Sequence, residues 1–99
     1  MVLLVRGARQ VGKTYSIRQL GNSFEHFVEV NFEKQKDIHL FFKNSLDPLQ
    51  LINKLSAFFS VPITPGKTLL FFDEIQACPE AFASLRFFYE SLPDLHVAA

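Results

Sequence analysis

Eight consecutive residues near the start of the chain have the types and spacing of a phosphate-binding loop. They match the pattern G-x-x-x-x-G-K-[ST] at every fixed position and comprise Gly7, Ala8, Arg9, Gln10, Val11, Gly12, Lys13 and Thr14. Glycines allow the backbone to curl so that successive N–H groups point at phosphate oxygens. Lys13 adds a positive charge for the β- and γ-phosphates, and Thr14 offers a hydroxyl to Mg²⁺. The motif predicts a bound nucleoside triphosphate with Mg²⁺. A chance match is disfavoured because a strand pattern precedes the motif and a helix pattern follows it.

Two carboxylates form the second group of residues that could do chemistry. Asp73 and Glu74 directly follow the apolar run from residue 69 to 72. Ligands of parallel α/β sheets bind at the carboxyl ends of strands, so both motifs are expected at one edge of the sheet. There Asp73 is placed to hold Mg²⁺ as a Walker B aspartate does, and Glu74 to orient or deprotonate the attacking water. The structural alternative is that the two acids merely end a strand and cap the next helix.

The strands and helices that must position these groups alternate along the chain. Continuous apolar runs predict strands at residues 2–5, 27–31, 68–72 and 95–99. Apolar residues at helical spacing predict helices over residues 13–20 (with Gly21 as the C-terminal cap), 38–42, 48–59 (with Asp47 as N-cap) and 79–92. Strands that are apolar throughout are typical of sheets covered on both faces. The predicted fold class is therefore α/β with a mostly parallel sheet. Together with the phosphate-loop motif, this predicts a three-layer P-loop NTPase fold that is incomplete, with four strands of which the fourth is truncated.

Composition excludes several classes of protein. Of the 99 residues, 48% are hydrophobic, which excludes wholesale disorder, and the 10 basic and 10 acidic side chains balance. That balance removes the electrostatic argument for a polyanion binder. The single cysteine, Cys78, cannot form an internal disulfide, and no run approaches the ~20 apolar residues that a membrane span needs. We expect a cytoplasmic protein with no membrane partner.

Several sequence segments together resemble the ATPase module of a prokaryotic AAA+-like ATP-binding protein family. In that family a C-terminal domain of unknown function follows the module. The matching phrases are residues 6–14, 30–33, 69–76, 84–90 and 93–97. The resemblance implies ATP and Mg²⁺ as ligands, with Lys13 and Thr14 on the phosphates and metal, Asp73 on the metal, and Glu74 on the water. Lys13 and Glu74 are thus the predicted catalytic residues.

Two further polar residues are candidates for the same site. In many related ATPases a polar residue at the end of the second strand, here Asn31, hydrogen-bonds the catalytic glutamate and restrains it. The favoured interpretation of Asn31 is an ordinary asparagine at the end of a strand. Gln76 could also reach the site, but an ordinary structural role is again the favoured interpretation. Arg86 is interpreted as a solvated arginine rather than a contact to a neighbouring subunit.

The resemblance also implies elements that this chain lacks. Family members have a helical segment before the first strand. After the fourth strand they have a sensor residue, a fifth strand and arginines that complete hydrolysis. In the sheet, the fourth strand lies between the first and the third strands. Residues 1–99 are therefore expected to be a partial ATP-binding domain, a fragment that binds nucleotide without efficient hydrolysis.

Two other functions remain as alternatives. One is a P-loop kinase-type phosphotransferase, although the chain offers neither a lid nor an acceptor pocket. The other is a non-catalytic fragment or interaction module. Homo-oligomerisation of the full-length form, binding of nucleic acid and the work driven by ATP are left open by the sequence.

Overall fold

The computed structural model describes residues 2–3 and 11–99, in which four parallel strands form one sheet. The strands are β1 (Val2–Leu3), β2 (His26–Asn31), β3 (Thr68–Asp73) and β4 (His96–Ala98). Their spatial order is β1-β4-β3-β2, and every neighbouring pair is parallel. The predicted parallel α/β sheet is confirmed, and β4 lies between β1 and β3 as the resemblance implied. The remaining residues of the first predicted strand, Leu4 and Val5, lie outside the described residues.

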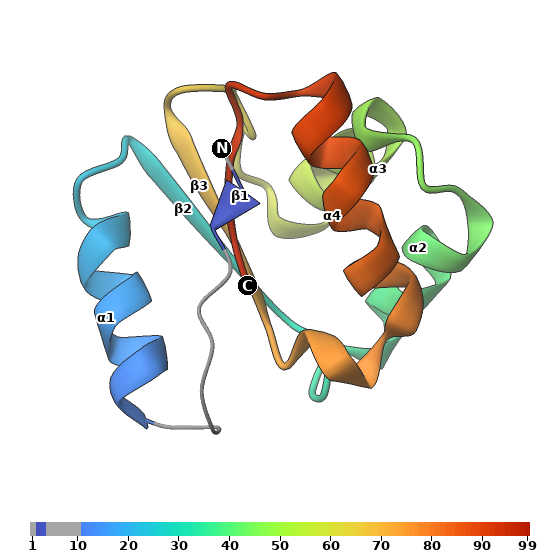
Figure 1. Cartoon of the computed structure of the whole chain (residues 1–99), viewed down its shortest axis with the longest axis horizontal. Coiled ribbons are helices and arrows are strands. Elements are labelled where there is room, and N and C mark those ends of the chain that lie inside the picture. The colour runs from blue at the N-terminus through green and yellow to red at the C-terminus, as the bar shows by residue number, and fades with distance from the viewer. Residues whose placement is uncertain (1, 4–10) are drawn as a thin grey trace.

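Helices cover both faces of this sheet (Figure 1). Helix α1 (Val11–Gly21) lies on one face, while the other carries α2 (His39–Asn44), α3 (Pro48–Phe59) and α4 (Pro79–Ser91). Short 3₁₀ turns, η1 (Lys36–Ile38) and η2 (Ile75–Ala77), precede α2 and α4. Prolines at the first positions of α3 and α4 start these helices as predicted, because proline has no N–H to leave unpaired there. Asp47 occupies the N-cap position of α3, but its side chain makes no capping hydrogen bond.

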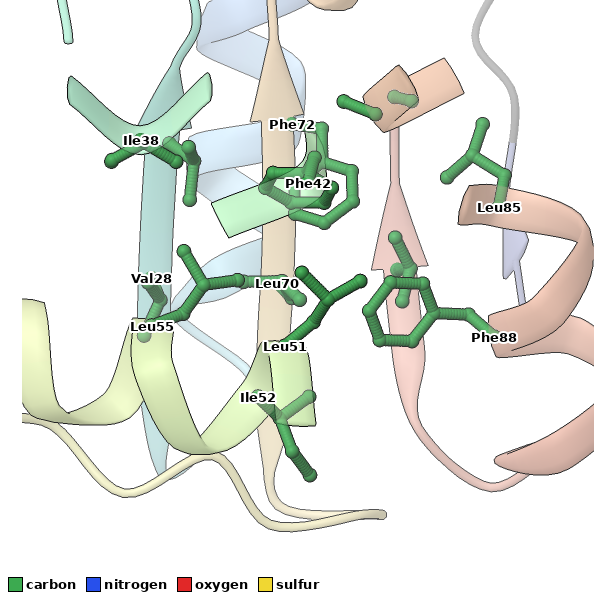
Figure 2. Close-up of a cluster of buried hydrophobic side chains, with 14 of the residues drawn as sticks. Val28, Ile38, Phe42, Leu51, Ile52, Leu55, Leu70, Phe72, Leu85 and Phe88 are labelled. Atoms are coloured by element: carbon green, nitrogen blue, oxygen red, sulfur yellow. The ribbon is translucent and has the colours of Figure 1, made fainter. Parts of the chain in front are cut away.

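The larger core lies between the sheet and the three-helix face, and its centre is the ring of Phe72 on β3. This ring meets those of Phe32, Phe42 and Phe88 edge-on, at centroid distances of 5.4, 5.6 and 5.9 Å. Aliphatic side chains of α3, Leu51 among them, pack beside these rings (Figure 2). Edge-to-face pairs add to the apolar burial. This side of the sheet therefore anchors β3, the strand that ends in Asp73.

The smaller core lies under α1 and contains a close helix–strand approach. Ile17 of α1 packs with Phe71 and Phe27 of the sheet. A Cβ atom placed on Gly21 would lie only 2.6 Å from Cδ1 of Phe27. Gly21 is the last residue of α1 rather than a left-handed cap, since Gly66 is the only described glycine with positive φ. The prediction that Gly21 serves as a C-terminal cap was therefore wrong. Glycine is needed at this position because it has no Cβ, which lets α1 approach the sheet.

Candidate functional site

The N-terminal end of α1 carries the described part of the phosphate-loop motif. Helix α1 begins at Val11, so Lys13 and Thr14 lie in its first turn, both partly exposed. The first N–H groups of a helix have no intrahelical acceptor, and together with the helix dipole they favour an anion. Gly7, Ala8, Arg9 and Gln10 lie outside the described residues. The described turn therefore presents a positive charge, a hydroxyl and a helix N-terminus.

Asp73 lies at the carboxyl end of β3, within the electrostatic reach of Lys13. Burial raises the pKa of the Asp73 carboxyl, the charges of Glu74 and Glu29 raise it further, and the charge of Lys13 lowers it. Its Oδ1 accepts a hydrogen bond from the backbone N–H of Glu74 at 3.0 Å, which also lowers the pKa. The structure thus brings Lys13 and Asp73 to the same edge of the sheet. An acid in a partly dehydrated position is one that a cation would stabilise in its ionised form.

Glu74 has an unusual backbone conformation at the turn that follows β3. Its φ of 53° and ψ of 45° lie in the left-handed region, which costs a non-glycine residue roughly 1–2 kcal/mol. The side-chain amide of Gln76 donates a hydrogen bond to Glu74 Oε1 at 2.6 Å. Backbone strain in a non-glycine residue is concentrated at functional positions. Ser60, which follows α3, has the same left-handed conformation, so this strain by itself assigns no role to Glu74.

Asn31 is adjacent to Asp73 but uses its side chain locally. It pairs in register with Asp73, at the end of β2. Its Oδ1 accepts hydrogen bonds from the backbone N–H groups of Glu33 and Lys34, both at 3.0 Å. This arrangement is an asparagine turn, in which the side chain replaces a backbone acceptor. The strand-end interpretation of Asn31 agrees with these bonds, and the side-chain amide that contacts Glu74 is that of Gln76.

An ion pair beside Asp73 was missed by the sequence analysis. Arg18 of α1 donates to Glu29 of β2 through Nε at 2.8 Å and through a terminal nitrogen at 2.9 Å. The hydrogen bond and charge of Glu29 raise the pKa of Arg18, with a smaller contribution from Asp73. The available signal was indirect: Arg18 follows Thr14 by one helical turn, and Glu29 points away from the face of its buried neighbours in β2. The pair ties α1 to the sheet close to the candidate site.

Other polar side chains have structural roles. Cys78 is buried, and this burial raises the pKa of its thiol, which donates to Glu80 at 3.7 Å. Arg86 is 78% exposed and pairs with Glu90 one turn later, as expected of a solvated arginine. Within residues 2–3 and 11–99, no three His, Cys, Asp or Glu side chains cluster as a metal site.

The comparison with protein-family models gives a match. A protein-family model described as an AAA domain matches residues 1–99. Neither the curated proteins nor the solved structures give a match. Among the described residues, no helix has both the length and the apolar character to cross a membrane.

Proposed function

The chain belongs to the AAA domain family, and from that premise we propose that it binds ATP with Mg²⁺ between the first turn of α1 and the end of β3. The reaction proposed for this site in the full-length protein is hydrolysis of ATP to ADP and phosphate. The observation that carries the proposal is that the N-terminal end of α1, which contains Lys13, and the carboxyl end of β3, which contains Asp73, lie at the same edge of the sheet (Figure 1). Two motifs far apart in the sequence thereby act on one small region.

The loop and the first turn of α1 would hold the phosphates. Backbone N–H groups of residues 7–12 would surround the phosphate oxygens, as the motif requires. Lys13 would place its ammonium on the β- and γ-phosphates, and the α1 N-terminus would add its dipole. This set of donors binds the charge that grows on the phosphates during transfer, so Lys13 contributes to catalysis as well as to binding.

The oxygen donors at the site fit Mg²⁺. The cation takes hard oxygen ligands, commonly one or two protein groups with substrate phosphates and waters. Thr14 offers a hydroxyl, and Asp73 offers a partly buried carboxylate whose ionised form is disfavoured by its burial. When bound, Mg²⁺ would neutralise charge on the phosphate oxygens. Thr14 and Asp73 would hold it.

Glu74 is the proposed base. Hydrolysis proceeds by in-line attack of water on the γ-phosphorus, and most of the catalysis is positioning and charge stabilisation. Glu74 follows Asp73 directly, at the edge of the sheet where the γ-phosphate would lie. It would orient the water and take its proton as the water oxygen bonds to the γ-phosphorus and the bond from that phosphorus to the leaving oxygen of ADP breaks.

Calorimetric titration of ATP into the protein with Mg²⁺ tests the proposal. We expect Lys13→Ala to weaken ATP binding by about 10–100-fold, because a charge-assisted hydrogen bond contributes roughly 1.5–3 kcal/mol. Lys43→Ala is the matched control, since Lys43 is an exposed lysine in the last turn of α2. Absence of ATP binding by the unmodified protein, or equal binding by the two variants, would contradict the proposal.

A further inference from the structure

The carboxylate of Glu74 is held from within its own turn. Gln76 Nε2 donates a short hydrogen bond to Glu74 Oε1, with 2.6 Å between the two atoms. We propose that Gln76 is a positioning residue for Glu74, which fixes the direction in which this carboxylate receives the attacking water. The role in hydrolysis rests on the proposed function, whereas the hydrogen bond itself does not.

The backbone on both sides of Glu74 is already fixed. The N–H of Glu74 donates to Asp73 Oδ1 at 3.0 Å, and its carbonyl accepts from the N–H of Ala77 at 3.1 Å. The next bond of the turn, from Cys78 N–H to the Ile75 carbonyl, is 3.0 Å long. These hydrogen bonds act on the backbone of Glu74 and not on the torsions of its side chain. The bond from Gln76 restricts those torsions.

An amide is chemically suited to this task. It donates without carrying an ionisable proton, so it orients a carboxylate without neutralising it. A carboxylate has about four acceptor sites, so accepting one bond from Gln76 is compatible with accepting another from water. A restrained base would be held in the attacking geometry rather than sampling it rarely, and such orientation is a recognised source of rate.

The side-chain amide of Asn31, which lies nearby, makes its hydrogen bonds to other groups. Asn31 pairs in register with Asp73, which brings its backbone to the same edge of the sheet. However, its Oδ1 accepts from two successive N–H groups of the following turn, which fixes the orientation of the whole side-chain amide. Of these two amides, it is that of Gln76 which has a hydrogen bond to Glu74. The assignment therefore follows from geometry that residue spacing does not reveal.

Single-turnover hydrolysis tests the role of Gln76. With protein in excess over ATP, Gln76→Met keeps the size of the side chain and removes the donor. We expect a rate constant at saturation about tenfold lower, with the protein concentration at half-saturation unchanged, because the lost bond acts on the base and not on ATP. Gln50→Met, at an exposed glutamine of α3, is the matched control. Equal, measurable rates for the two variants, or an equal change in both parameters, would overturn the proposal. Absence of hydrolysis by the unmodified protein would instead count against the proposed function.

The side-chain amide signal of Gln76 in a ¹⁵N–¹H spectrum tests the hydrogen bond separately. Glu74→Asn keeps a residue that tolerates the left-handed backbone, but its shorter side chain no longer reaches Gln76. We expect the Gln76 amide protons to move upfield in this variant, while those of Gln50 stay in place. An unchanged Gln76 signal would overturn the proposal. If hydrolysis is unaffected by Glu74→Asn while the amide signal moves, it is the proposed function of Glu74 that fails.

Discussion

Replacing Gly21 with alanine should destabilise the protein, although the same change in an exposed helix is stabilising. The added Cβ would lie 2.6 Å from Cδ1 and 2.8 Å from Cγ of Phe27, whereas carbon atoms prefer separations of roughly 3.5–4.0 Å. The Phe27 ring would have to move by about 1 Å to remove this overlap. It is stacked on the buried ring of Phe71 at 6.3 Å, and its backbone is fixed in register with Leu69. The clash therefore cannot be relieved by a small side-chain rotation.

The expected size of the effect follows from two opposing contributions. Overpacking of this kind costs roughly 1–3 kcal/mol, and exchanging glycine for alanine in a helix returns about 0.5–1 kcal/mol. The difference between these ranges is about 0–2.5 kcal/mol, and because two ring atoms would lie under 3.0 Å from the new Cβ we expect a net loss of about 1–2 kcal/mol in the free energy of unfolding. For a domain of this size each kcal/mol lowers Tm by roughly 4–8 °C.

Urea denaturation of Gly21→Ala, Phe27→Leu and the double variant measures this clash. Leucine lacks the ring atoms that meet the new Cβ, so the double variant should lose less stability than the sum of the single variants. Gly66→Ala is the control: its φ of 81° makes alanine unfavourable, but nothing lies within 4 Å of its Cβ position, so Phe27→Leu should not rescue it. A Gly21→Ala protein as stable as the unmodified one, or strictly additive losses, would refute the close approach of α1 to the sheet.

Three further changes probe the sheet, the ion pair and the candidate site. Phe72→Ala should cost about 3–5 kcal/mol in urea denaturation because its ring is fully buried, whereas the exposed Phe82 should lose only roughly 0.5 kcal/mol in the same exchange. Arg18→Met should lower Tm more than Arg86→Met, and its effect should shrink as NaCl is raised to about 1 M, since the Arg18–Glu29 pair has two short bonds and the Arg86 pair one at 3.5 Å; a salt-independent loss would argue against an electrostatic contribution. Burial raises the pKa of Asp73 in the folded protein above its ordinary value of 3.8. Between these two pKa values the folded state therefore holds more of the Asp73 proton than the unfolded state does, so the free energy of unfolding falls as the pH rises through this range. Asp73→Asn should therefore be more stable than the unmodified protein at neutral pH without ligand, and this advantage should vanish below about pH 4; an advantage that persisted at low pH would exclude the carboxylate as its cause.

Local sequence patterns predicted the described strands and the four helices to within about two residues at their ends, but not the two 3₁₀ turns. Apolar runs predict strands because a sheet covered on both faces has no polar side. Pro79 predicts the start of α4 because proline is tolerated in the first turn of a helix but not in its interior. Parallel strands then bring their carboxyl ends to one edge, so Lys13 and Asp73 could be assigned to a common site before any coordinates.

The tertiary structure decided which neighbours these residues have. Gly21 is needed because α1 approaches Phe27, a contact that depends on how the helix packs and not on where it ends. The Arg18–Glu29 pair and the bond from Gln76 to Glu74 likewise depend on the side-chain directions set by α1, β2 and the left-handed turn after β3. Spacing along the chain determines the element and the edge on which a residue lies. The orientation of its side chain is determined by packing between segments distant in sequence, which local patterns do not encode.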